Sequence, residues 1–275
     1  PYPAPQNEYE FREHNATELM GIVLSGLSEP SPAIQIHWGA DIYLDWVSST
    51  RTRREVSSNT VEPWAPRFPD GSRMDSYGIY SDLSVELFST LTLNGGLRVS
   101  YFKTSLAQRN LGPLIEGGEV LENTDVTGAM GLVWSPLPDL RIVASYRRGF
   151  RAPNIFDLGT LGPRPGNRYN IPSPDLRPEK INTYDLGLAY SGERVDFQVF
   201  AFYSSYDSKI ASVLTGDQVG GPNGPDVVQS ANEALMRLAG VEGSIEVLLS
   251  RRFSFLAEAF YTWGEQQVEG GPVQP

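Results

Sequence analysis

The stretch Ala33-Ile-Gln-Ile-His-Trp-Gly-Ala-Asp-Ile-Tyr-Leu-Asp-Trp-Val47 alternates apolar and polar side chains along its length. Ile34 and Ile42 fall on one parity, whereas His37 and Asp41 fall on the other. Because successive side chains of a β-strand point to opposite faces, this period of two predicts a strand with one apolar and one polar face. The stretch is longer than the roughly 5–6 residues of an average strand, and a membrane-spanning strand needs about 9–11.

The same alternation returns in other segments of the chain. One parity is apolar and the other polar or charged, as expected for a barrel wall with lipid outside and water inside. A soluble sandwich or small barrel also alternates, and it is the alternative that this pattern leaves open. Aromatic residues near the segment ends favour a membrane barrel, because aromatic girdles mark both interfaces. The segments are 91–101, 140–147, 183–190 and 195–199, and the aromatic residues are Trp46, Tyr77, Tyr101, Trp134, Tyr146, Tyr184, Tyr190 and Trp263.

About ten such segments are joined by links that alternate between short and long. Outer-membrane barrels place short turns on the periplasmic side and longer loops outside. We therefore expect an all-β fold, a transmembrane antiparallel β-barrel. The expected short links are 28–31, 88–90, 136–138, 191–193 and 250–251, and the expected long links are 48–73, 106–121, 151–178 and 215–235.

Composition narrows the classes of function. A hydrophobic share of 40%, a mean hydropathy of −0.28 and the lack of a long apolar run argue against a bundle of membrane helices. The chain has no cysteine, so disulfides and thiolate chemistry are absent from it. A net charge of −11 argues against nucleic acid as a partner, because nucleic acid requires a basic surface.

Two motifs stand near the middle of the chain. Phe150-Arg151-Ala152-Pro153 ends one expected strand, and Ser173-Pro174-Asp175-Leu176-Arg177-Pro178-Glu179 precedes the next. Together they resemble the Phe-Arg-Ala-Pro box and the Asn-Pro-x-Leu-x-Pro-Glu box of TonB-dependent outer-membrane receptors, with Ser173 in place of the Asn. Gly39–Asp45 and Gly95–Tyr101 are similar to earlier barrel strands of the same receptors.

The resemblance implies a barrel of about 22 strands, within the range for outer-membrane barrels, that is closed by an N-terminal plug domain. Residues 1–275 are then expected to be one partial barrel domain, without the plug, the TonB box and the last strands. The implied function is TonB-energised uptake of a scarce nutrient in a Gram-negative outer membrane, and we expect this nutrient to be a ferric siderophore or similar anionic chelate. The implied partners are TonB, this small ligand, and membrane lipid with lipopolysaccharide. The alternative is a passive porin or adhesin-like barrel.

The loop between the motifs is locally basic in an acidic chain. Arginine offers a planar fork of donors for carboxylate or catecholate oxygens, and tyrosine adds rigid amphipathic area. We expect Arg151, Arg168 and Tyr169 to contact an anionic ligand. The alternative is that the arginines of this region pair with structural carboxylates or with the anionic outer leaflet. These arginines are Arg147, Arg148, Arg151, Arg164 and Arg168.

Enzyme and metal sites have little support in the sequence. The only histidines, His14 and His37, lie on different segments, and no Gly-x-Ser-x-Gly motif occurs. No catalytic residue, cofactor or metal ligand is therefore expected. The resemblance to TonB-dependent receptors implies a histidine between the two motifs in a haem receptor; residues 154–171 contain Tyr169 but no histidine, which disfavours haem, although tyrosine can ligate haem iron. A calcium site at Asp217, Asn223 and Asp226 is less plausible than a solvated loop.

Overall fold

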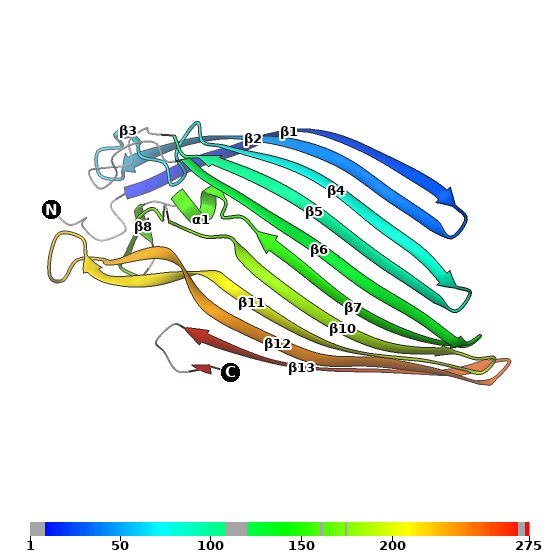
Figure 1. Ribbon diagram of the computed structural model, residues 1–275. Coiled ribbons are helices and arrows are strands. Elements are labelled where there is room, and N and C mark those ends of the chain that lie inside the picture. The colour runs from blue at the N-terminus through cyan, green and yellow to red at the C-terminus, as the bar shows by residue number, and fades with distance from the viewer. Residues whose placement is uncertain are drawn as a thin grey trace.

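The computed structural model describes residues 9–107, 120–159, 162–164, 166–173, 175–268 and 273–274. Its main feature is one curved antiparallel sheet in which ten long strands follow each other in chain order (Figure 1). These strands are β1 (Tyr9–Ser31), β2 (Ile34–Glu55), β4 (Arg73–Phe88), β5 (Leu91–Ser105), β6 (Val120–Leu137), β7 (Leu140–Arg151), β10 (Glu179–Ser191), β11 (Val195–Gln218), β12 (Asp226–Ser250) and β13 (Phe253–Val268).

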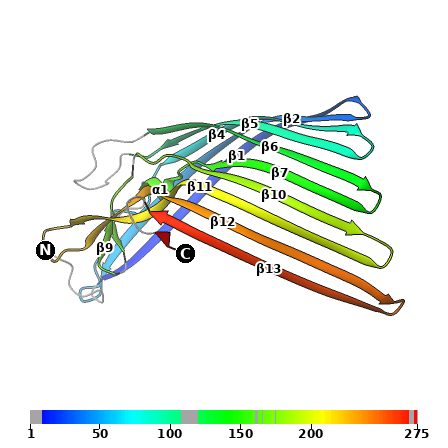
Figure 2. The same ribbon diagram turned by 60° about the horizontal axis from the view of Figure 1, so that its bottom comes forward.

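The shorter elements belong to the connections. They are β3 (Val61–Trp64), α1 (Ile155–Gly159), β8 (Gly162–Arg164), β9 (Arg168–Asn170) and β14 (Val273–Gln274). No helix in the described ranges is long and apolar enough to cross a membrane. Figure 2 shows the sheet as an open, curved wall, with α1 and β9 near one end of the strands.

The expected segregation of links by length is confirmed for the links that the structure describes, whereas most of the expected long link 106–121 lies outside the described residues. Residues 32–33, 89–90, 138–139, 192–194 and 251–252 form tight links, which gather at one end of the sheet (Figure 1). The connections through residues 56–72 and 152–178 lie at the opposite end, which we call the mouth.

One expected loop is mostly strand. Residues 215–235 were predicted as a long link, but β11 continues to Gln218 and β12 begins at Asp226, which leaves only residues 219–225 as the turn. Bulges between Tyr206 and Lys209 and between Leu214 and Gln218 break the alternation of apolar and polar side chains. The sequence pattern therefore does not predict a strand there. Gly221 in the turn has φ of +104°, a conformation that favours glycine. In the same way, β2 runs on to Glu55, beyond the expected loop start at Ser48.

The two faces of the sheet differ as the sequence predicts. On β2, Ile42 is 41% exposed, whereas its neighbour Asp41 on the opposite face is only 6% exposed. On the apolar face, Tyr77 and Tyr101 lie with ring centroids 5.9 Å apart. Further along the same face, Tyr184 lies 5.0 Å from Tyr146 and 6.4 Å from Tyr203. Rows of aromatic residues above an exposed aliphatic surface are typical of a lipid-facing wall.

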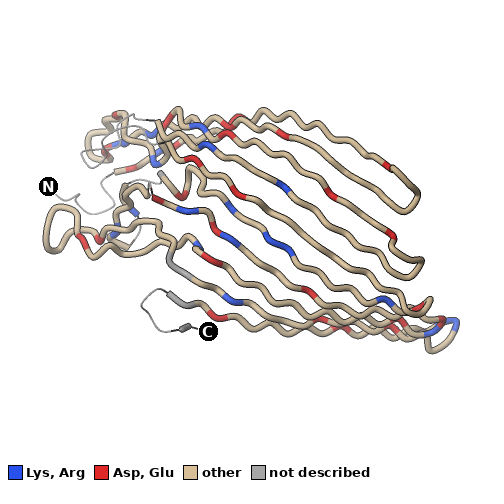
Figure 3. Tube along the Cα trace, viewed as in Figure 1, with Lys and Arg blue, Asp and Glu red and all other residues tan. Residues whose placement is uncertain are grey.

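Charged residues occur along the strands as well as near their ends (Figure 3). Several are held on the polar face by ion pairs, including Arg98 with Asp41 and Arg147 with Asp185. A charge is tolerated on this face because the interior of an outer-membrane barrel is wet. We refer to the polar face as the inner wall.

A small hydrophobic core lies at the mouth. Four buried side chains from separate segments form it: Leu106, Ile155, Leu158 and Leu176. Inner-wall residues Val47 and Met74 and the β11 residue Ile210 pack against this cluster. The connection from β7 to β10 therefore folds onto the inner wall and places its own residues in the mouth.

Candidate functional site

The mouth loop, residues 152–178, starts where β7 ends. Pro153 has no amide proton to donate, so pairing stops after Arg151, as the sequence predicts. Asn154 and Asp157 then bond each other reciprocally: each backbone N–H donates to the other's side-chain oxygen, at 3.1 and 3.0 Å. This arrangement caps the first turn of α1. It orients Leu158, which is 2% exposed, into the core of the mouth.

Arg151 clamps the two ends of the loop together. Its Nε and Nη2 donate to the two carboxylate oxygens of Glu179 at 2.9 and 3.0 Å, and its Nη1 donates to Asp157 at 2.6 Å. Glu179 also accepts a hydrogen bond from the backbone N–H of Ile210 at 2.8 Å. Burial raises the pKa of Glu179, but the hydrogen bonds from Arg151 and Ile210 outweigh it, and the pKa lies below its usual value.

The return half of the loop is tied to β12. Ser173 is buried, its Oγ accepts the backbone N–H of Ser230 at 2.9 Å, and its own N–H donates to the carbonyl of Leu158. Asn232 accepts the N–H of Arg177 at 2.7 Å and donates to the carbonyl of Arg177 at 2.8 Å. The serine that departs from the expected motif therefore makes a specific bridge between the mouth loop and β12.

Arg168 and Tyr169 lie on β9, which pairs in parallel with β12 and antiparallel with β8. Arg168 is exposed and Tyr169 is half-buried. Within the ranges that the structure describes, the Arg168 side chain has no hydrogen-bond or ion-pair partner. Among the described residues, no hydrogen bond or ion pair joins Arg168 or Tyr169 to Arg151, which lies at the base of the loop.

The other arginines of this region have acceptors. Arg147 donates to Asp185 at 2.7 Å, Arg148 to Asp125 at 2.9 Å, and Arg164 to Asn170 and Ser212 at 3.3 and 3.4 Å. These contacts match the alternative in which most of the arginines serve structural pairs. Of these five arginines, Arg168 is the one whose guanidinium has no acceptor among the described residues.

Sequence reasoning missed several residues that build this site. The carboxylates of Asp157 and Glu179 accept hydrogen bonds from Arg151. Gln229 and Asn232, on β12, donate to backbone carbonyls of the loop. The spacing Asn154-x-x-Asp157 could have predicted the cap, because residues at this spacing form reciprocal side-chain-to-backbone hydrogen bonds at the first turn of a helix. Nothing in the local sequence marks Gln229 or Asn232, because their partners lie 57 and 55 residues away.

The remaining candidates stay apart. His14 lies on β1 and His37 on β2, paired with Thr50 and Asp82 respectively rather than with each other. Asp226 accepts a hydrogen bond from Gln218 at 3.1 Å. Among the described residues, no group of three or more His, Cys, Asp or Glu side chains is arranged to hold a metal ion.

Comparison with curated proteins finds relatives in sequence. The chain is 22% identical to the rhizobactin receptor of Rhizobium meliloti (strain 1021), over 98% of this chain and 39% of that protein. It is 34% identical to the hemoglobin-haptoglobin utilization protein B of Neisseria meningitidis serogroup C, over 34% of this chain and 12% of that protein. The chain thus spans well under half the length of these curated relatives.

The fold is also found among solved structures. The copper transporter OprC superposes with a TM-score of 0.74 at 16% identity, covering 92% of this chain and 38% of OprC. The family model described as TonB dependent receptor-like, beta-barrel matches residues 7–274. The chain therefore belongs to the TonB-dependent receptor β-barrel family, whose members lie in the outer membrane of Gram-negative bacteria.

Proposed function

We propose that this chain is part of the barrel domain of a receptor that takes up a ferric siderophore, or a similar anionic chelate, across the outer membrane. TonB would supply the energy through parts of the protein outside this chain. The family supports uptake in general, and the relative named as a rhizobactin receptor supports a siderophore in particular. Family and relatives are receptors and transporters rather than enzymes.

The observation that carries the proposal is the mouth loop. Residues 152–178 fold onto the inner wall and are held there by their own core and by β12. A preorganised loop reduces the entropy that ligand binding must offset. It presents β9, with Arg168 and Tyr169, on a rigid support.

The three site residues have different parts in this proposal. Arg168 supplies a guanidinium that no described neighbour neutralises, which suits carboxylate or catecholate oxygens of the ligand. Tyr169 adds aromatic area beside it. Arg151 already donates to Glu179 and Asp157, so it acts mainly by holding the loop in place and contributes to the positive field at the mouth.

The test uses the full receptor with Arg168→Ala and Tyr169→Ala. Binding of radio-iron chelates (citrate, a hydroxamate and a catecholate) is measured on intact cells, with haem as a competing probe. We expect at least one chelate to bind the wild type, and both variants to bind it more weakly while the barrel assembles normally.

Arg177→Ala is the matched control, because Arg177 is exposed and its described hydrogen bonds use only its backbone. If all variants bind the chelate as tightly as the wild type, Arg168 and Tyr169 do not contact the ligand and have a structural role only. Uptake that does not depend on TonB would favour the passive porin, and binding of haem alone would change the ligand class.

A further inference from the structure

The apolar face of β11, β12 and β13 contains a hollow of about 490 Å³. Val199, Gly243 and Ala259 are paired directly across these three strands and line it. Val199 also pairs with Leu188, which shares the parity of Tyr184 in the aromatic row. The hollow therefore opens on the side of the sheet that faces lipid, and we call it the outer-face groove.

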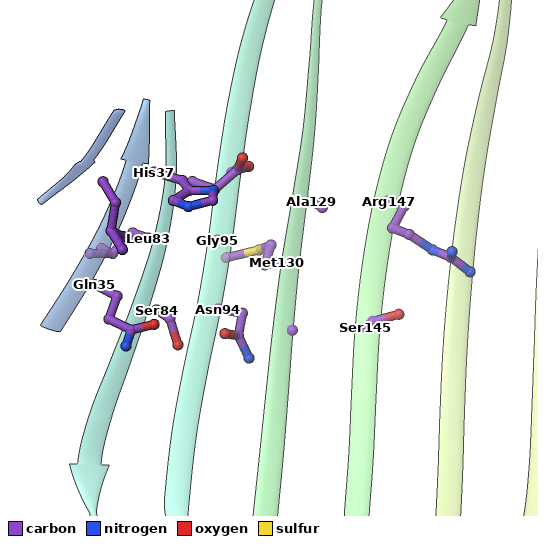
Figure 4. Close-up of a pocket in the computed structure, with 14 residues that line it drawn as sticks. Gln35, His37, Leu83, Ser84, Asn94, Gly95, Ala129, Met130, Ser145 and Arg147 are labelled. Carbon is purple, nitrogen blue, oxygen red and sulfur yellow. The ribbon is translucent and has the colours of Figure 1, made fainter. Parts of the chain in front are cut away.

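Small residues form the floor of the outer-face groove, and larger apolar side chains surround them. The floor residues are Gly243, Ala257 and Ala259, and the surrounding ones are Phe197, Val199, Val241, Ile245 and Tyr261. A hollow of the inner wall has a different lining, with polar side chains such as Gln35, Asn94 and Arg147 (Figure 4). Apolar walls that face no other atoms lose dispersion contacts. On this face of an outer-membrane barrel, the atoms that supply such contacts are those of lipid acyl chains.

The outer-face groove lies between two levels of aromatic side chains. Ala259 is four residues from Trp263, toward the mouth, and four residues from Phe255, toward the short links. Trp263 and Phe255 are both exposed and share the parity of Ala259. Because aromatic girdles mark the two interfaces between a barrel and the membrane, the groove lies at the depth of the hydrocarbon.

Three exposed arginines lie at the short-link end of the same strands. Arg194 precedes β11, while Arg251 and Arg252 form the link between β12 and β13. The described hydrogen bonds of Arg194 and Arg252 use only their backbones: the carbonyl of Arg194 accepts the N–H of Leu248 at 2.8 Å, and the N–H of Arg252 donates to Ser250 at 3.3 Å. No carboxylate in the described ranges forms an ion pair with these arginines, so their guanidinium groups are available to an external anion.

The nearby strand carboxylates belong to the opposite face. Asp196 and Glu246 are paired with each other, one residue away from Phe197 and Ile245 of the groove. Because adjacent residues of a strand point to opposite faces, these carboxylates lie on the inner wall. Glu193 is the one acidic residue in the two links that contain the arginines. The two links together are therefore positively charged, although the whole chain has a net charge of −11.

The separation between the arginines and the groove fits one phospholipid. Ala257, at the end of the groove nearest the short links, is five residues from Arg252, which corresponds to roughly 17 Å along a strand. One leaflet contributes about 15 Å of the hydrocarbon core, and its acyl chains span that depth. Short turns of outer-membrane barrels lie on the periplasmic side. A lipid of the periplasmic leaflet with an acyl chain in the groove therefore has its phosphate at the level of these arginines.

We propose that the outer-face groove, together with Arg194, Arg251 and Arg252, binds one anionic phospholipid of the periplasmic leaflet. One acyl chain fills the groove, and the phosphate lies among the guanidinium groups, whose planar donors match phosphate oxygens. A zwitterionic phospholipid has the same chains but brings an ammonium group close to the arginines, so it binds more weakly. The inference concerns the lipid-facing side of the barrel and does not depend on which ligand the receptor takes up.

The test measures lipid binding to the full receptor purified in detergent. Native mass spectrometry follows titrations with dioleoylphosphatidylglycerol and with dioleoylphosphatidylethanolamine, a zwitterionic lipid with the same chains. We expect one phosphatidylglycerol to bind about tenfold more tightly than phosphatidylethanolamine. Arg251→Gln combined with Arg252→Gln should remove most of this preference while the barrel assembles normally, because both residues are exposed in a link.

A second variant, Ala259→Phe, tests the groove itself. Its ring fills the groove while the outer face stays apolar, so phosphatidylglycerol should bind about tenfold more weakly. Met130→Phe is the control, because it places the same ring at a 67% exposed position on the outer face of β6. Arg141→Gln is the control for charge, because Arg141 is exposed near a short link but has the parity of the inner wall. Both controls should bind lipid as the wild type does.

Each outcome decides the inference. Equal affinity of the wild type for the two lipids would refute it, as would an unchanged preference in the double arginine variant. Unchanged binding by Ala259→Phe would also refute it, because the arginines would then attract head groups without a chain in the groove. If Arg141→Gln loses the preference as fully as the double variant, the effect comes from net charge and not from this site.

Discussion

Arg98 on β5 reaches across β4 and binds Asp41 on β2 through two parallel hydrogen bonds of 2.7 Å each. The side chain passes over Gly78, which is paired with both Asp41 and Ser100 and has no Cβ to obstruct it. Asp41 is 6% exposed, so its charge depends on this guanidinium. The pair connects three strands of the inner wall and fixes their relative positions.

Removing Arg98 should destabilise the barrel. In Arg98→Met the Asp41 carboxylate keeps its burial and loses its partner, which should cost roughly 1–3 kcal/mol. The free energy of unfolding is measured by denaturant titration of the full receptor in lipid. Asp41→Asn combined with Arg98→Met should recover part of the loss, and simple additivity of the two single changes would contradict the pairing.

The lipid-facing assignment can be tested by placing a charge on the outer face. Leu186 is 60% exposed and lies two residues from Tyr184 of the aromatic row. Leu186→Arg should cost roughly 2–4 kcal/mol if this position is near mid-bilayer. Val143→Arg, on the inner wall, should cost clearly less because water solvates the new charge. Similar costs for both substitutions in the same folding titration would overturn the assignment of faces.

The core of the mouth loop depends on Leu158. Leu158→Ala should remove about 2–5 kcal/mol from the folded loop, as expected for a fully buried leucine, while the ladders of the long strands remain intact. Hydrogen exchange should show faster exchange within residues 152–178 and little change in β4 and β5. Val56→Ala, at a 48% exposed position, is the control. Uniform loss of protection in all strands would mean that the loop is not a separate unit.

The clamp of Arg151 on Glu179 should make the mouth loop sensitive to acid. The pKa of Glu179 in the folded protein lies below its ordinary value of 4.5. Its contribution to stability is therefore present above about pH 4.5 and is lost as the pH falls through the lower, folded value. Proteolysis of residues 152–178 should accelerate on acidification in the wild type. In Glu179→Gln, residues 152–178 should be cleaved faster at neutral pH, and acidification should accelerate their cleavage less than in the wild type. An equal acceleration in the variant would mean that other groups cause the sensitivity to acid.

At the mouth, the local sequence predicts some features of the loop but not its long-range contacts. The strand stop at Pro153 and the basic character of the loop follow from local chemistry, and the structure has β7 ending at Arg151. The bonds of Ser173 to Ser230 and of Arg177 to Asn232 do not follow from local chemistry, because each joins residues 55 or 57 positions apart. The ligand contacts of Arg168 and Tyr169 stay a prediction.

The sequence by itself determined the two faces of the strands, most of their extent and the alternation of short and long links, but not the outer ends of β2, β11 and β12. These are local properties, since a period of two assigns each side chain to lipid or to water, and Pro and Gly interrupt pairing where they stand. Only the tertiary structure decided which distant groups meet. Arg98 finds Asp41 because the register puts Gly78 between them, and β9 joins β12 because the mouth loop folds inward onto Val47 and Met74. Such contacts depend on register and curvature, which arise only when all strands pair at once.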